Sequence, residues 1–209
     1  MEVAVKQSSG QDSGKKVNLN DAIYNIDPSD HAIYLDVKLI QANQRHGNAK
    51  TKQRNEIAGS TRKIKKQKGT GGARAGSIKN PLFKGGGTIF GPEPRFYGFK
   101  VNKKVKRLAR ASALSYKARE NKITVVEDFT MNAPKTSEYQ GILQNLELSG
   151  KKTLMVLPEQ IKSLYLSSRN LKGTKVVTAS DINTYDILNA QDLIVFESAV
   201  PLIEKTIEK

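Results

Sequence analysis

Residues Gly69 to Gly76 read GTGGARAG, a glycine-rich run of the kind that cradles phosphates in dinucleotide-binding loops. That chemistry needs a preceding buried strand, a following helix and glycines at fixed spacing, because the backbone must approach the pyrophosphate at a helix N-terminus. Arg74 stands where the third glycine belongs, and the preceding KIKKQK cannot form a buried strand. We interpret the run as a flexible polycation rather than as a cofactor loop.

Two further groups of residues have part of the spacing of a catalytic motif, but the other residues that each motif requires are missing. The segment 150–153, GKKT, has a second lysine where a phosphate-binding loop requires Ser or Thr, and Asn145 stands where its first glycine belongs. Ser60 and Lys63 have the spacing of a serine and lysine nucleophile pair, but the usual partner motifs are missing. Neither nucleoside triphosphatase nor serine hydrolase activity is indicated.

The side chains that bind metals or transfer protons are scattered. His31 and His46 are the only histidines, and without cysteine the chain can form neither a thiolate metal site nor a disulfide. Glu127 and Asp128 follow a predicted strand, where open α/β sheets bind ligands, but no glycine-rich turn accompanies them. We interpret the histidines as solvent or backbone contacts and the acids as loop or cap residues. No metal and no cofactor is expected.

The net charge is concentrated in one internal segment. The whole chain carries +15, and from Arg45 to Lys106 there are seventeen Lys or Arg against two acids, Glu56 and Glu93. The remainder therefore has no net charge. Such a segment attracts polyanions, because each Lys or Arg that neutralises a phosphate releases a counterion. Eleven of the sixteen glycines also lie here, and glycine lets the backbone enter a crowded groove.

Membrane association is not expected. The basic run RKIKKQK at 62–68 has no apolar helical face, and the glycines that follow it stop a helix. No apolar run approaches the roughly 18 residues of a spanning helix, and the first ten residues lack the pattern of a secretory signal. We expect a cytoplasmic protein whose polyanionic partner is RNA.

Five aromatic residues occupy the second half of the basic segment: Phe83, Phe90, Phe96, Tyr97 and Phe99. Each ring could stack on an unpaired base, as in many RNA-binding proteins. Alternatively, the last three anchor the returning chain onto a folded domain, and the sequence leaves both readings open. Because the segment can bury little apolar surface, we expect it to be disordered in the free protein and to order on RNA.

The flanking sequences predict a single α/β domain. Residues 2–5 and 16–19 are predicted to form a hairpin. A helix capped by Ser29 or Asp30 should run to about residue 44, and another should cover 105–118. Apolar runs then alternate with helical stretches, which is typical of a parallel sheet covered on both faces. The predicted strands are 123–126, 153–157, 175–179 and 193–196, and the predicted helices are 135–148, 159–168, 181–190 and 199–208.

The predicted fold class is α/β, a mostly parallel sheet flanked by helices, with a long basic extended loop inserted after the first helix. The predicted division is a globular body of residues 1–44 plus 105–209 and a Gly-rich loop of residues 45–104. Such a loop reaches at most about 100 Å out and back, well beyond the radius of gyration of about 15 Å expected for the body. This reach indicates a body on the outside of a large RNA particle and a loop that enters it.

The central sequence resembles one family. QRHGNAKTKQRNEIAGSTRK (44–63), KKQKGTGGARAGSIKNPLFKGGGTIFGPEPR (65–95), KVNKKVKRLARASALSYKA (100–118) and ITVVEDF (123–129) follow one another as in the bacterial family of large-subunit ribosomal protein four. The resemblance implies a structural protein, not an enzyme, that binds large-subunit ribosomal RNA beside other large-subunit ribosomal proteins. It also implies that the loop tip lines the nascent-peptide exit tunnel.

The resemblance also implies roles for individual residues of the loop. Ile64-Lys65-Lys66 stands where bacterial relatives usually have Pro-Trp-Arg, and Gly72 replaces a common Arg. The tip that would meet the nascent peptide comprises Lys66, Gln67, Lys68, Gly69, Thr70 and Gly71. The cations expected to bind RNA are Arg45, Lys50, Lys52, Arg54, Arg62, Lys63, Lys65, Lys66, Lys68, Arg74, Lys79, Lys84, Arg95, Lys100, Lys103 and Lys104.

Two alternatives remain at this stage. A free RNA-binding translational regulator could use the same loop on messenger RNA. An α/β enzyme with a basic localisation arm would need a polar pocket at the carboxyl ends of the strands, and the sequence shows no convergent set of side chains there. The positions that such a pocket would use are Asp128, Pro158, Ser180 and Ser198.

Overall fold

The computed structural model describes residues 1–208. The chain forms two compact units. The first, here called the body, comprises residues 1–41 and the chain from Phe99 onward. The second, here called the arm, comprises Ala42–Gly98. The boundary predicted at residue 104 falls inside a helix that starts at Lys103.

The body is built on a six-stranded sheet with the order β2-β1-β3-β6-β4-β5. β1 and β2 form an antiparallel hairpin, and every other neighbouring pair is parallel, which confirms the predicted mostly parallel sheet. The strand order itself was not predicted. The strands are β1 Glu2–Lys6, β2 Asp12–Asn18, β3 Ile123–Val126, β4 Thr153–Leu157, β5 Thr174–Thr178 and β6 Asp192–Phe196.

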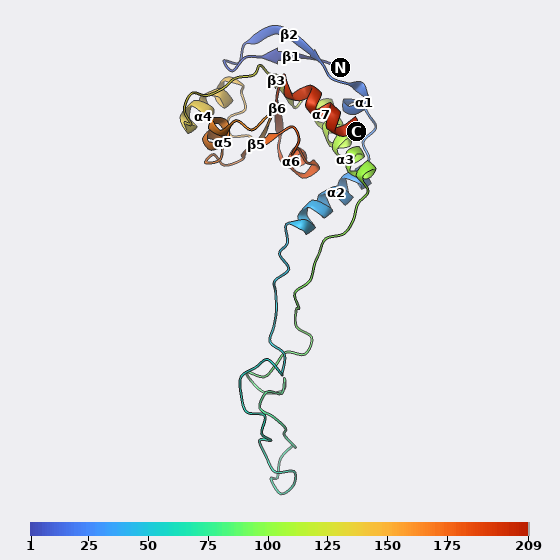
Figure 1. Ribbon diagram of the computed structural model, residues 1–209, viewed down its shortest axis with the longest axis vertical. Coiled ribbons are helices and arrows are strands. Elements are labelled where there is room, and N and C mark those ends of the chain that lie inside the picture. Colours follow the sequence, from blue (N-terminus) through green and yellow to red (C-terminus); the bar gives the residue numbers. More distant parts are fainter. Residues whose placement is uncertain (209) are drawn as a thin grey trace. The chain divides into compact units, whose positions relative to one another are not determined.

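Helices cover both faces of the sheet (Figure 1). α4 packs against α5, whereas α3 packs against α6 and α7. The single-turn helix α1 was missed, since four residues carry no helical periodicity, and the basic loop therefore follows the second helix rather than the first. The helices are α1 Asp21–Tyr24, α2 Asp30–Asn43, α3 Lys103–Arg119, α4 Thr136–Asn145, α5 Lys162–Ser168, α6 Thr184–Asn189 and α7 Ala199–Glu208.

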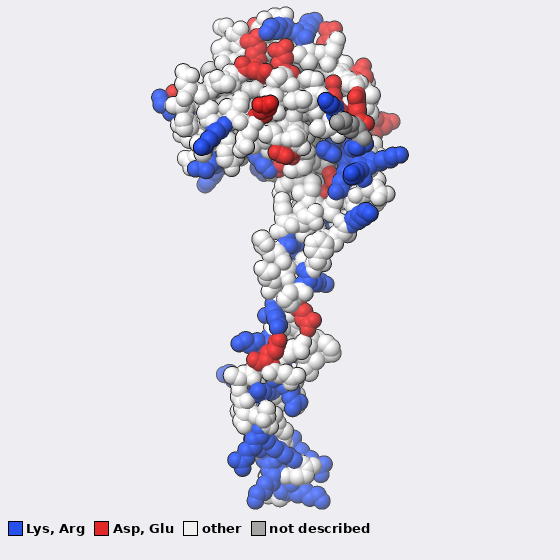
Figure 2. Space-filling model, viewed as in Figure 1, with Lys and Arg blue, Asp and Glu red and all other residues white. Residues whose placement is uncertain are grey.

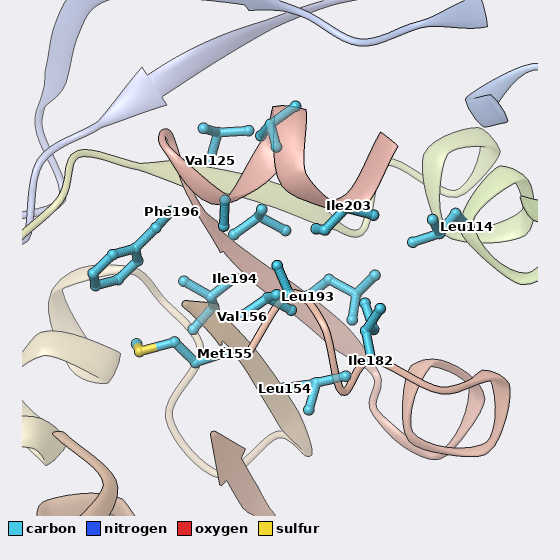
Figure 3. Packing of buried hydrophobic residues seen from close by; sticks show 14 of the residues in the cluster. Leu114, Val125, Leu154, Met155, Val156, Ile182, Leu193, Ile194, Phe196 and Ile203 are labelled. Carbon is cyan, nitrogen blue, oxygen red and sulfur yellow. The ribbon is translucent and has the colours of Figure 1, made fainter. Parts of the chain in front are cut away.

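The core lies on both faces of β4 and β6, the two most completely buried strands of the sheet. All five residues of β4 are buried, and Figure 3 shows its Leu154 and Met155 beside Leu193 of β6. Ile203 of α7 and Leu114 of α3 close the core in the same view. Strands buried on both faces must be apolar throughout, which is why these runs were recognisable in the sequence.

One of the buried side chains of α2 is a carboxylate. Asp36 is buried and accepts a hydrogen bond from Thr184 Oγ1 at 2.6 Å, which ties α2 to the start of α6. A buried carboxylate is tolerated only when it is hydrogen-bonded. Of the apolar residues that favoured a helix here, Leu39 is buried and the others are half-buried: Ile33, Leu35, Val37 and Ile40.

None of the helices within residues 1–208 is both long and apolar enough to cross a membrane.

The substitution Leu154→Ala should lower the free energy of unfolding by about 2 to 5 kcal/mol, because it opens a cavity between layers that cannot collapse. Urea unfolding followed by circular dichroism measures the change. The matched control is Leu202→Ala, on the 39% exposed side chain of α7, for which we expect a change within about 0.5 kcal/mol. Equal losses from both substitutions would contradict the central position of β4.

Candidate nucleic-acid interface

The arm carries thirteen Lys or Arg and two acids. Figure 2 shows blue side chains crowded around the turn of the arm. Residues 61–74 are exposed without exception. From Gln44 to Asn102 no helix or strand forms, so the positions of these cations depend on contacts within the arm itself.

The outgoing and returning segments of the arm run side by side (Figure 1) and are joined by backbone hydrogen bonds. Arg95 N–H donates to Gly47 O at 3.2 Å, and Thr88 N–H donates to Lys52 O at 3.1 Å. The bonds are too irregularly spaced for a regular strand pair, and Pro92 contributes an acceptor but no donor. Residues 47–56 and 86–95, which hold these contacts, are called the neck below.

Three glycines, Gly47, Gly87 and Gly91, allow the segments of the neck to approach each other, and a Cβ on Gly47 would lie 2.1 Å from Arg95 O. A Cβ on Gly87 would lie 2.3 Å from the backbone nitrogen of Arg54, and a Cβ on Gly91 would lie 1.7 Å from Thr51 Oγ1. No other residue fits at these separations without displacing the partner segment. The glycines of the returning segment are therefore packing residues.

Both acids of the arm are engaged within the neck. Glu56 accepts hydrogen bonds from Lys50 Nζ at 2.6 Å and from Gln53 N–H at 3.1 Å. The hydrogen bond from Lys50 holds the pKa of the Glu56 carboxyl below its usual range. Glu93 accepts a hydrogen bond from Gln53 Nε2 at 2.6 Å. Glu93 thus joins the two segments of the neck, Glu56 braces the outgoing segment, and the rest of the arm has no negative charge.

Tyr97 lies between two arginines of the arm. The Arg45 guanidinium is 3.6 Å and the Arg95 guanidinium 4.7 Å from the centroid of its ring. A hydrogen bond from Arg95, with the positive charges of both arginines, lowers the pKa of the Tyr97 hydroxyl. Neither interpretation of Tyr97 from the sequence included this contact with two arginines.

The remaining aromatic residues differ in exposure. Phe90 is 99% and Phe96 85% exposed, so their faces are free to stack on bases. Phe83 is half-buried within the arm. Phe99 belongs to the body, where the Lys38 ammonium lies 6.0 Å from its ring centroid. Only two of the five rings are thus fully available as stacking platforms.

The tip is open. Gly69 and Gly71 have φ angles of +83° and +64°, a left-handed backbone that favours glycine, and no atom lies within 4 Å of either Cβ position. Lys63 Nζ donates a hydrogen bond to Gln67 Oε1. A hollow of about 570 Å³ adjoins the tip and is lined by Ser60, Arg62, Lys63, Ile64, Lys65, Lys66 and Ile78.

Thirteen of the sixteen cations expected to bind RNA lie in the arm, and Lys100, Lys103 and Lys104 lie in the body. Lys106, Arg107 and Arg110 continue the basic run along α3 and were not among the cations expected to bind RNA.

Two acids at the carboxyl ends of the strands have structural contacts. Glu127 pairs with Lys15 at 3.1 Å, and Asp128 Oδ1 accepts a weak hydrogen bond from Ser198 N–H at 3.4 Å. Across residues 1–208 no three His, Asp or Glu side chains gather into a potential metal site. His31 and His46 are both exposed, and His31 stacks on Tyr34 with ring centroids 6.4 Å apart.

Comparison with known proteins gives a consistent result over both units. The sequence profile of the ribosomal protein L4/L1 family matches residues 17–206. The chain is 58% identical over 205 residues to the large ribosomal subunit protein uL4 of Parabacteroides distasonis, with 98% of each chain covered. It is 57% identical over 209 residues to the protein of the same name from Flavobacterium johnsoniae, with 100% of each chain covered. These matches confirm the resemblance found in the sequence.

The substitution Gly87→Ala should open the neck, because forced overpacking of this kind costs about 1 to 3 kcal/mol. Hydrogen exchange of the Thr88 amide, which donates across the neck, should accelerate by about fivefold to a hundredfold. Gly76→Ala is the control, since a Cβ at Gly76 meets nothing within 4 Å. Exchange at random-coil rates in the unsubstituted protein would contradict the neck.

Tyr97 should ionise below the ordinary tyrosine pKa of about 10, because the phenolate accepts a hydrogen bond from Arg95 and lies beside two positive charges. Ultraviolet difference absorbance against pH, with the Tyr97→Phe variant subtracted, isolates this residue. Arg95→Leu should move the midpoint upward. A Tyr97 midpoint at or above 10, or no response to Arg95→Leu, would show that the stack does not form.

Proposed function

Because the chain belongs to the ribosomal protein L4/L1 family, we propose that it binds large-subunit ribosomal RNA through its arm as part of the large ribosomal subunit. The curated relatives are named as proteins of that subunit, and the chain is accordingly a structural ribosomal protein and not an enzyme. As the relatives are bacterial, the particle in which it works lies in the cytoplasm. RNA and other large-subunit ribosomal proteins are its partners there.

The observation that carries the RNA-binding proposal is the near absence of charge compensation in the arm. Of its thirteen cations, only Lys50 forms an ion pair with another residue in the part of the chain that the structure describes. A polyanion that supplies phosphates would neutralise the other twelve. Each such contact releases counterions from the RNA, and this release provides the driving force for binding.

The arrangement of the arm suits RNA better than other polyanions. Phe90 and Phe96 present exposed rings among the cations, and stacking of an unpaired base on such a ring adds about 1 to 3 kcal/mol. The neck keeps the two segments in one register, so that cations from both segments approach the same RNA. Arg45 and Arg95, both held beside the ring of Tyr97, would then contact phosphates with little further ordering.

We assign the tip a different role from the neck. Lys66 to Gly71 form an exposed turn with no backbone hydrogen bond to the rest of the arm, and we propose that this turn orders on RNA and lines the nascent-peptide exit tunnel. The family resemblance supports the tunnel position. The two positive-φ glycines support a turn narrow enough to border a passage.

The triple substitution Lys65→Gln, Lys66→Gln, Lys68→Gln, here called the tip variant, should weaken binding to deproteinised large-subunit ribosomal RNA. The slope of log affinity against log salt should become shallower by about 2, since each phosphate contact contributes about 0.7 to 0.9. Filter binding over a series of salt concentrations measures the slope. The control variant is Lys151→Gln, Lys162→Gln, Lys172→Gln, which removes the same charge from exposed positions of the body.

A free regulator acting on messenger RNA would show the same salt dependence, so a second measurement separates the two functions. The protein should sediment with large subunits after a moderate salt wash. Release into the supernatant, with messenger RNA binding retained, would favour the regulator and reject the structural role of the arm.

A further inference from the structure

Half of the buried polar residues lie on three neighbouring helices. Ten polar or charged residues are buried within residues 1–208, and five of them belong to α2, α3 or α6. The five are Asp36, Ser112, Ser115, Lys117 and Thr184. Replacing a buried hydrogen-bonded pair with apolar groups of the same shape often costs no stability. Buried hydrogen bonds do, however, define one geometry, because they weaken steeply when they are misaligned. Their concentration on these helices indicates that they specify how the helices are arranged.

One face of α3 binds the chain that connects α1 to α2. Ser115 Oγ donates a hydrogen bond to Ile23 O at 2.9 Å and accepts one from Ile26 N–H at 3.3 Å. Ser112 Oγ accepts a hydrogen bond from Ser29 N–H at 3.1 Å. The connecting segment forms no helix or strand. The two serine hydroxyls therefore supply partners that its backbone groups would otherwise lack.

Two larger side chains extend this face of α3. Tyr116 OH donates to Asp30 Oδ1, in the first residue of α2, at 2.6 Å. Arg119 Nη2 donates to Ile26 O at 2.9 Å and to Asp27 Oδ1 at 3.2 Å. With the two serines they recur at i, i+3, i+4 and i+7 and so share one side of the helix. The four residues are called the clasp below: Ser112, Ser115, Tyr116 and Arg119.

Both α2 and α3 are also fastened to α6 (Figure 1). Asp36 of α2 accepts the hydrogen bond from Thr184 at the start of α6. Lys117 Nζ of α3 donates to Ala190 O at 2.8 Å and to Gln191 O at 3.3 Å, just after the end of α6. These carbonyls provide the partners that a buried ammonium requires. The clasp and these two ties, called the polar frame below, join the three helices pairwise into a closed triangle.

The frame holds the two helices between which the arm is inserted. The arm begins at Ala42, in the last turn of α2, and ends at Gly98, five residues before α3. The first backbone contact of the neck, between Gly47 and Arg95, closes a long loop. Closing such a loop costs conformational entropy, and the cost falls when the two ends of the chain are already held. The frame therefore bears on the free energy of closing the neck.

We propose that the polar frame is a positioning device for the arm, which fixes the ends of α2 and α3 and thereby preorganises the neck for binding RNA. The inference rests on the proposed function for the choice of RNA. The clasp residues act through the arm and need no contact with RNA themselves. A preorganised neck loses less conformational entropy on binding, so the frame raises affinity without adding a phosphate contact.

The test uses the full-length variant Ser115→Ala, which removes two hydrogen bonds of the clasp and leaves every charge unchanged. Exchange of the Thr88 amide in the neck should accelerate by about threefold to thirtyfold, as expected for the net loss of one or two hydrogen bonds. Affinity for deproteinised large-subunit ribosomal RNA should fall by up to about the same factor. The slope of log affinity against log salt should stay unchanged, because no phosphate contact is lost.

The matched control is Ser167→Ala in α5. Ser167 is 1% exposed, and its Oγ donates to Ser163 O at 2.7 Å within the same helix, outside the frame. This variant also loses a buried serine hydroxyl, but it should change neither Thr88 exchange nor RNA affinity. Equal acceleration in both variants would mean that the neck follows the stability of the whole body, and would overturn the proposal.

A second variant covers the case in which Ser115→Ala does not fold. Tyr116→Phe removes only a hydroxyl, from a side chain that is half-buried. Its melting temperature should fall by no more than about 5 °C. Thr88 exchange should still accelerate, by about twofold to tenfold for one hydrogen bond.

The outcomes separate this proposal from the proposed function. Unchanged Thr88 exchange in the folded Tyr116→Phe variant overturns the polar frame, and loss of slope in the tip variant then still supports RNA binding by the arm. Faster exchange without loss of RNA affinity, or with a shallower salt slope, also overturns the positioning role. Faster exchange with lower affinity at an unchanged slope supports it.

Discussion

Like charges held at short distance repel, and that repulsion limits what this chain can form by itself. Two unit charges 4 Å apart in water interact by about 1 kcal/mol, and at physiological salt the interaction is screened only beyond about 8 Å. In the arm, Lys65, Lys66 and Lys68 lie within four positions of one another. The cations of the tip therefore reach a low free energy only beside a surface rich in negative charge, whereas the neck is also held by contacts within the arm.

The neck shows how the arm keeps its shape despite the repulsion. Its segments are joined through backbone groups and through the hydrogen bond between Gln53 and Glu93, so the contacts that align the segments consume none of the cations. Gly87 and Gly91 bring the backbones together where any side chain would separate them. Arg45 and Arg95 are oriented by a neutral ring, which leaves their charges uncancelled. Order and available positive charge therefore coexist in the same short segment.

In the body, one helix, α3, combines a packed half with a charged half. In its second half α3 packs on α6 and α7, through apolar residues and through Lys117, whose ammonium is satisfied by carbonyls. In its first half it has no internal partners for its cations. The transition occurs within about two turns, between Arg107 and Leu114. Because the second half is packed rigidly, the first half of the helix has a fixed direction. The cations of a flexible basic tail would have no fixed direction.

The amino-acid sequence by itself determined where most of the elements and the charge lie. β3 and β4 have the predicted bounds of 123–126 and 153–157, and α7 the predicted 199–208, because strands buried on both faces and helices with one apolar face leave local patterns that need no knowledge of the partner. The basic segment was equally visible, since charge is a property of single residues. The family and the large-subunit assignment followed from its order of glycines and lysines.

Only the tertiary structure decided which residues meet. The insertion of β6 between β3 and β4, the stacking of Tyr97 between Arg45 and Arg95 and the bond from Thr184 to buried Asp36 join residues that are distant in the chain. Whether a lysine is compensated, like Lys117, or left open, like Lys106, depends on such partners. Local periodicity shows which residues of an element are apolar and which face of the element they share. It carries no information about the other element that will cover that face.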